Sequence, residues 1–253
     1  MFRRKVYLPT LAVIFLVFAV AMAINPVDRH DWMLENVLVI LCVVLIAATY
    51  RQFPLSRISY TLIFLFLMLH EIGSHYTYAL VPYDDWFRSM TGTGLNELFG
   101  FERNHFDRFT HFAYGLLLAY PIREMFIRIA EVKGFWSYFL PLDLTMSTSM
   151  LYELVEWGAA EFFGGELGQA YLGTQGDVWD AHKDMALASL GALVADHHDG
   201  GGAVPEQTAA DHADHRLPLP FRKMRLEAEL FDSLDDVADF FDTRAVFHDD
   251  NGH

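Results

Sequence analysis

The apolar residues of the chain gather in long blocks that are separated by short polar segments. Six blocks of roughly 18–22 residues are present, and this is the length that a helix needs to cross the hydrocarbon core of a membrane. They cover residues 7–24, 32–50, 60–78, 108–126, 135–157 and 178–195. The pattern predicts an all-α fold, a polytopic transmembrane helical bundle of about six spans.

The basic residues predict how these spans are oriented. Lysine and arginine are enriched in cytoplasmic loops. They occupy alternate ends of the six blocks, so a six-span chain places them on one face of the membrane. These residues are Arg3, Arg4, Lys5, Arg51, Arg57, Arg123, Arg128, Lys133, Arg222, Lys223 and Arg225. We therefore expect both termini in the cytoplasm, with segments 27–31, 82–107 and 161–177 outside.

The first block has a second interpretation. A basic start, an apolar run and the small residues of Ala21-Met22-Ala23 also fit a cleavable signal peptide. Cleavage would leave five spans and an external N-terminus. The apolar run is long for a signal peptide, so a retained first span is the favoured reading.

Composition divides the chain into a transmembrane domain, residues 1–195, and an acidic tail, residues 196–253. The tail holds 14 acidic and 5 basic residues, so it carries −9 of the formal net charge of −15. Such acidity argues against nucleic-acid binding, which needs basic patches. The His/Asp-rich segment 197–215 predicts a flexible linker rather than a metal site. Apolar residues at helical spacing then predict a short amphipathic helix over 222–242.

Cysteine use excludes two kinds of site. The single cysteine, Cys42, lies within an apolar block. An intrachain disulfide and a cysteine-based zinc site are therefore both ruled out.

Ionisable residues recur near one end of the last four blocks, where their burial would be costly without a function or a partner. The third block ends in His70, Glu71 and His75. The two histidines are five residues apart and so lie on different faces of a helix, unlike the HExxH zinc motif, whose histidines share one face. Glu71 and His75 do share a face. The alternative to a functional site is a helix end that is polar only because it lies at the membrane interface.

The fourth and fifth blocks each carry a polar stripe. Asp107 and His111 stand one helical turn apart, a spacing that suits two ligands of one cation or a hydrogen-bonded pair. Glu153 and Glu156 share a face of the fifth block, where two carboxylates need an arginine, a metal or a shared proton. The alternative to a functional site is an ion pair between Arg108 and one of these glutamates that serves structure only.

The sixth block begins with a third stripe. Asp177, Asp180 and Asp184 follow at i, i+3 and i+7. Asp177 suits a helix cap, but Asp184 lies about two turns in, where capping does not explain it. The small residues that follow, Ala186, Ala188, Ser189, Gly191 and Ala192, predict close packing against another helix. The predicted topology places these three stripes and the polar end of the third block in the outer leaflet, whereas merely tolerated polar residues would scatter over both leaflets.

Four of these stretches resemble the YjdF-like family of bacterial inner-membrane proteins. They are HEIGSHYTY (residues 70–78), RNHFDRFTHFAYG (103–115), YELVEW (152–157) and GDVWDAHKDMALASLGAL (176–193). The resemblance covers roughly residues 5–195, and the tail lies outside it. The last two blocks are also distantly similar to the VanZ-like pattern. The resemblance implies a multi-span fold in the bacterial inner membrane but no established reaction.

Three classes of function follow from the stripes. The leading hypothesis is a membrane-embedded hydrolase or transferase with a site that opens to the outer leaflet and acts on lipid or cell-envelope substrates. Its metal ligands would be Asp107, His111, Glu156, Asp180 and Asp184, which suit Zn, Mn or Fe. Its catalytic residues would be His70, Glu71, His75, Arg108 and Glu153, with Arg103 as an alternative phosphate-binding group. We expect membrane lipids as partners and consider a homo-oligomer.

The other two classes are a proton-coupled transporter and a non-catalytic membrane protein. A transporter needs polar residues along a route through the midplane, whereas the inner halves of these blocks look apolar. A non-catalytic protein would use the stripes as a structural polar network that locks four helices together.

Overall fold

The computed structural model describes residues 4–163 and 174–198, and all regular structure in these two ranges is helical. The helices are α1 (Arg4–Met22), α2 (Arg29–Thr49), α3 (Arg57–His75), α4 (Tyr83–Thr91), α5 (Leu95–Phe99), α6 (Phe106–Ile129), α7 (Trp136–Phe163) and α9 (Asp180–His198). The six long helices coincide with the six apolar blocks, which confirms the all-α prediction. The expected tail linker and the helix 222–242 lie outside the described residues.

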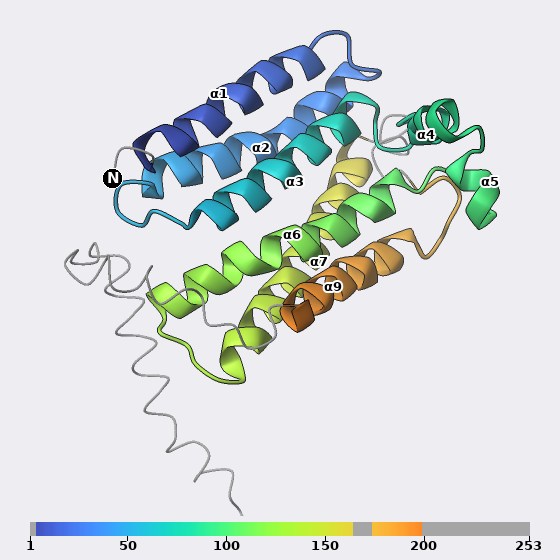
Figure 1. Ribbon diagram of the computed structural model, residues 1–253. Helices are drawn as coiled ribbons and strands as arrows, with labels where there is room; N and C mark the ends of the chain where they lie inside the picture. The colour runs from blue at the N-terminus through green and yellow to red at the C-terminus, as the bar shows by residue number, and fades with distance from the viewer. Residues whose placement is uncertain (1–3, 164–173, 199–253) are drawn as a thin grey trace, which may run out of the picture.

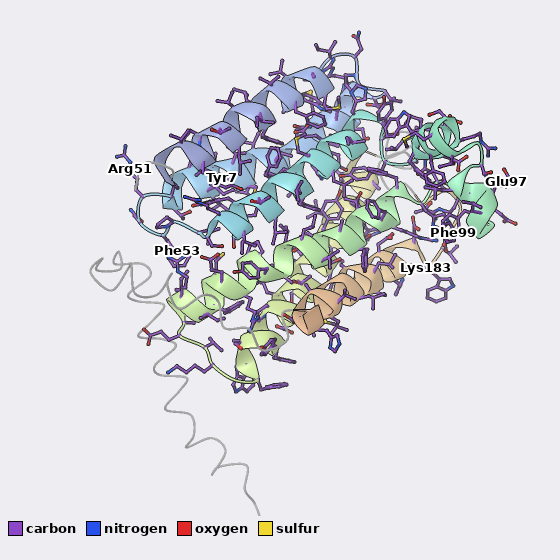
Figure 2. All side chains as sticks on the ribbon, in the orientation of Figure 1. Tyr7, Arg51, Phe53, Glu97, Phe99 and Lys183 are labelled. Carbon is purple, nitrogen blue, oxygen red and sulfur yellow. The ribbon has the colours of Figure 1, made fainter. Side chains whose placement is uncertain are left out.

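The long helices lie side by side and alternate in direction (Figure 1). We call the end at which α2, α6 and α9 begin the cavity end, and the other the opposite end. In Figure 2, Glu97, Phe99 and Lys183 mark the cavity end, and Tyr7, Arg51 and Phe53 mark the opposite end. The short helices α4 and α5 sit at the cavity end beside the start of α6.

Two central helices organise the bundle. α3 packs against α6, α1 and α2 pack on α3, and α7 and α9 pack on α6. The Tyr7 hydroxyl forms a hydrogen bond with Thr61 on α3. α1 and α2 expose many large apolar side chains, among them Leu16, Val17, Ile40 and Val44. Exposed apolar surface of this extent suits contact with lipid.

The closest approach in the bundle is between α6 and α9, and two glycines permit it. A Cβ atom at Gly115 would lie 1.8 Å from the Ala188 carbonyl oxygen, and one at Gly191 would lie 2.1 Å from the Phe112 carbonyl oxygen. Ala188 and Ala192 are fully buried in the same contact. The small residues of the sixth block therefore do pack closely against another helix, as predicted.

Membrane-spanning character is clearest in part of the bundle. Within the described residues, α2 and α3 are long and apolar enough to cross a membrane, and the apolar part of α1, Val6–Met22, is shorter. Ionisable side chains interrupt α6, α7 and α9, because these helices carry the polar stripes. The count of six spans and the cytoplasmic placement of both termini stay predictions.

Candidate functional site

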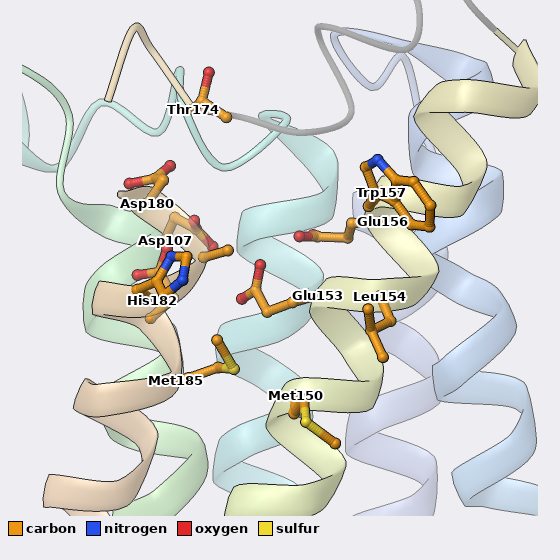
Figure 3. Close-up of a pocket in the computed structure, with 12 residues that line it drawn as sticks. Asp107, Met150, Glu153, Leu154, Glu156, Trp157, Thr174, Asp180, His182 and Met185 are labelled. Carbon is orange, nitrogen blue, oxygen red and sulfur yellow. The ribbon is translucent and has the colours of Figure 1, made fainter. Parts of the chain in front are cut away.

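A cavity of about 350 Å³ lies at the cavity end, between α7 and the first turns of α9. One part of its wall is acidic and is formed by Asp107, Glu153, Glu156, Asp180 and Asp184. Figure 3 shows Glu153 and Glu156 on α7 pointing across the cavity toward Asp107 and Asp180. Met150, Leu154, Trp157 and Met185 form an apolar part of the wall, and Thr174, Ala181 and His182 complete it.

Three residues of the predicted ligand set meet here: Asp107 and Asp184 line the cavity, and His111 lies next to them without lining it. Asp107 and His111 stand one turn apart on α6, and Asp184 comes from α9; one potential ligand atom of each lies within 4.8 Å of the other two. The close packing of α6 against α9 brings them together. Carboxylate oxygens and an imidazole nitrogen at this separation can coordinate one divalent cation.

Two carboxylate oxygens at the site have no hydrogen-bond donor among the described residues. Asp184 is 2% exposed, and its Oδ1 atom accepts no hydrogen bond. Oε1 of Glu153 is also buried without a hydrogen bond, although it lies 3.4 Å from His111 Nε2. Buried carboxylates are costly unless a cation, a donor or a proton compensates them. The cavity can therefore accept a ligand that supplies a cation, a hydrogen-bond donor or a proton to these carboxylates.

Asp180 lines the cavity, but cationic side chains already hold it. Arg103 donates to Oδ1 at 2.7 Å and to Oδ2 at 3.2 Å, and Arg108 donates to Oδ1 at 3.0 Å. Arg103 also donates to the Thr174 carbonyl oxygen at 2.8 Å. This cluster fastens the start of α9 to the start of α6, and it leaves Asp180 less available to a metal than Asp184.

Asp177 extends the ion-pair cluster on its exposed side. Its carboxylate accepts hydrogen bonds from Lys183, from the Trp179 backbone N–H and from Arg108. The Lys183 ammonium, the Trp179 N–H and Arg108 lower the pKa of Asp177 below its usual range. Across the cluster, burial and the guanidinium groups of Arg108 and Arg103 lower the pKa of His105. Arg108, predicted to be catalytic, is thus paired with two aspartates.

The two histidines of α3 diverge, as their spacing predicted. His70 is buried, with Nε2 3.2 Å from the Glu35 carbonyl oxygen and Nδ1 2.6 Å from the Tyr78 hydroxyl. A carbonyl oxygen only accepts, so Nε2 carries the proton and Nδ1 accepts from Tyr78. His75 donates from Nδ1 to the Met22 carbonyl oxygen at 2.7 Å. Neither histidine belongs to the cavity wall.

Glu71 differs from both histidines because its buried side chain has no hydrogen-bond partner among the described residues. Its side chain is fully buried, and neither carboxylate oxygen has a hydrogen-bond partner within the described part of the chain. It is not among the residues that line the cavity. The structure thus brings Glu153 and Glu156 to the metal-ligand group and leaves His70, Glu71 and His75 outside it.

Two acidic residues of α2 were not predicted as functional candidates. Asp31 and Glu35 are buried, and both oxygens of Glu35 accept from the Tyr152 hydroxyl at 3.1 Å. The Tyr152 ring in turn meets the His111 ring edge-on, with centroids 5.8 Å apart. Glu35 therefore holds a tyrosine that packs on a candidate ligand. An acid within the first turn of the second apolar block, Glu35, was the available signal.

The halves of the helices at the opposite end are not uniformly apolar, which corrects the sequence interpretation. At the opposite end, Glu124 of α6 is fully buried and accepts from the Ser56 backbone N–H at 2.8 Å, from the Ser59 hydroxyl and from Arg128. Arg123 is buried with its guanidinium carbon 4.0 Å from the centroid of the Tyr138 ring. From the sequence, Arg123 was counted among the loop residues, but α6 continues past Pro121 to Ile129.

Comparisons with known proteins agree with the resemblance found in the sequence. The family model described as "Predicted membrane protein (DUF2238)" matches residues 7–197. The "Inner membrane protein YjdF" of Escherichia coli strain K12 is 37% identical over 192 residues, which make up 76% of this chain and 88% of that protein. No solved structure gives a significant match. The chain therefore belongs to the DUF2238 family of predicted membrane proteins and is a protein of the bacterial inner membrane.

Proposed function

We propose that this protein is a metal-dependent enzyme of the inner membrane and that Asp107, His111 and Asp184 bind one divalent cation. The observation that carries the proposal is the position of Asp184. It is buried and lines the cavity, its Oδ1 atom has no donor in the part of the chain that the structure describes, and one of its oxygens lies within 4.8 Å of potential ligand atoms of Asp107 and His111. A cation there would compensate the buried charge.

The ligand set favours a catalytic over a purely structural metal. Two carboxylates and one imidazole suit Zn, Mn or Fe, and three protein ligands leave coordination positions for water and substrate. Glu156 lines the same cavity and is a further candidate ligand. Asp180 is the weakest candidate of the predicted set because Arg103 and Arg108 already bind it.

The reaction class that fits best is hydrolysis, or the related group transfer, at an ester or amide of a lipid or cell-envelope substrate. The cation would polarise the reacting oxygen. Glu153, whose Oε1 atom lacks a hydrogen bond, would accept a proton from the attacking water. The water oxygen bonds to the acyl carbon, the bond to the leaving alcohol or amine breaks, and Glu153 returns the proton to that leaving group. His70 and His75 lie outside the wall, so the proposal gives them no proton transfer.

Metal content after reconstitution tests this proposal. The full-length chain is purified without a histidine tag, stripped with chelator, dialysed against Zn²⁺, Mn²⁺ or Fe²⁺, and analysed by mass spectrometry of the metal. Asp184→Asn and His111→Gln should each bind one equivalent less than the unmodified chain. Asp177→Asn is the matched control, because Asp177 begins the same helical stripe outside the cavity wall. Any ions held by the histidines of the tail cancel in the difference.

The result that overturns the proposal is equally clear. If all four proteins are folded by circular dichroism and retain the same metal content, the cavity holds no metal. The acidic stripes would then act as a polar network that binds the helices together.

A further inference from the structure

The cavity wall has more negative charge than its surroundings compensate. Five carboxylates line it, and no lysine or arginine does within the described residues. The segment 164–173, which connects α7 to Thr174, has no lysine or arginine in its sequence either. Arg103 and Arg108 are engaged with Asp177 and Asp180. One divalent cation offsets two charges, so a metal-loaded cavity still favours a positively charged ligand over an anionic one.

The apolar part of the wall reaches the outer surface of the bundle. On α7, Met150 is 49% exposed, Leu154 is 51% exposed and Trp157 is 58% exposed. All three line the cavity as well. In an inner-membrane protein, exposed apolar side chains on a long helix face acyl chains. A lipid could therefore place its head among the acids while its chains stay against α7.

Trp157 and Glu156 stand next to each other at this boundary. Figure 3 shows both on α7 beside the cavity. An indole face together with a carboxylate is a favourable environment for an ammonium group, through cation–π and charge-assisted hydrogen-bond contacts. Among the described wall side chains, the donors that an anionic head group could use are the Thr174 hydroxyl, the His182 ring and the indole N–H of Trp157, and none of these carries the fixed positive charge of a lysine or arginine.

We propose that the ligand of this cavity is a phospholipid whose head group carries an amine, and that it enters from the membrane along α7. The inference rests on the proposed function, since it names the substrate class for that site. Phosphatidylethanolamine has the required chemistry, because its ammonium group can face Glu156 while its acyl chains lie along α7. Its test measures binding alone and needs no turnover.

Competition between two lipids with identical acyl chains provides the test. The full-length chain in detergent is offered equal amounts of phosphatidylethanolamine and phosphatidylglycerol, and native mass spectrometry counts each bound lipid. We expect a preference for phosphatidylethanolamine on the order of fivefold, which corresponds to about 1 kcal/mol. Glu156→Gln and Trp157→Leu should each bring the ratio close to one. Glu161→Gln, at an exposed acid farther along α7, should leave the ratio unchanged.

The outcomes separate this inference from the proposed function. Equal binding of the two lipids by the unmodified chain, or an unchanged ratio in Glu156→Gln, overturns the inference even if the metal is bound. A lipid preference without any bound metal overturns the metal site and leaves the inference standing. Glycerophosphoethanolamine, which has the head group but no acyl chains, should compete weakly; competition as strong as that of the lipid contradicts entry from the membrane.

Discussion

Arg103 binds Asp180 with both terminal nitrogens of its guanidinium group, at 2.7 and 3.2 Å. Arg103 precedes α6, and Asp180 is the first residue of α9. This bidentate pair joins the two helices at the end where the candidate ligands meet. It explains why an acid that the sequence placed among the metal ligands is better described as a structural anchor of the site.

Removing that anchor should destabilise the bundle. Arg103→Ala leaves the buried Asp180 carboxylate with Arg108 as its remaining guanidinium partner, so we expect a loss of about 2 kcal/mol in the free energy of unfolding. Arg103→Lys keeps the charge but not the two-point geometry, and should lose about half as much. Denaturant unfolding in detergent measures both, with the exposed Lys133→Ala as control. Full stability of Arg103→Ala would contradict the anchoring role.

Asp177 should make stability depend on acid pH. Lys183, the Trp179 N–H and Arg108 lower its pKa in the folded chain, so its contribution is present above the unfolded pKa and disappears as pH falls through the folded one. The melting-temperature difference between the unmodified chain and Asp177→Asn should be constant from pH 7 to about pH 5. It should shrink below about pH 4. A melting-temperature difference that grows as the pH falls would contradict a stabilising role for the ionised Asp177 carboxylate.

Close packing of α6 and α9 can be tested with one methyl group. A Cβ atom at Gly191 would meet the Phe112 carbonyl oxygen at 2.1 Å, whereas one at Gly158 has no atom within 4 Å. Gly191→Ala should cost about 2–3 kcal/mol and reduce metal binding, because Asp184 moves away from Asp107 and His111. Gly158→Ala, in the last two turns of α7, should be neutral or slightly stabilising. Equal effects of the two substitutions would refute the packing argument.

Glu124 provides a control for the whole site. It is fully buried at the opposite end and is bonded to Ser56, Ser59 and Arg128. Glu124→Gln should lower the free energy of unfolding by about 2 kcal/mol but leave the metal content of the folded protein unchanged. If this substitution also removed the metal, general loss of fold would explain the effects of the site variants.

The helices and much of the site were predictable from periodicity. Apolar blocks of membrane-crossing length gave the six long helices. Spacings of three and four residues placed Asp107 with His111, Glu153 with Glu156, and Asp180 with Asp184 on common faces, because such residues are neighbours on a helix. Since α6, α7 and α9 also come together in space, these stripes converge on one cavity.

Pairing between distant segments was not predictable in the same way. Nothing in the spacing indicates that Arg103 binds Asp180, or that Tyr152 on α7 reaches Glu35 on α2. Those contacts depend on how whole helices pack. Periodicity also does not distinguish a buried charge from one in a loop, which is why Arg123 was counted among the loop residues.

X-ray absorption at the metal edge of the reconstituted chain tests the central claim most directly. Spectra of the unmodified chain and of His111→Gln are compared, and their difference isolates the site from any ions on the tail. We predict a component with oxygen ligands and one imidazole nitrogen per ion, which is absent in His111→Gln. Identical spectra for the two folded proteins, or an ion held without this imidazole, would contradict a metal site formed by Asp107, His111 and Asp184.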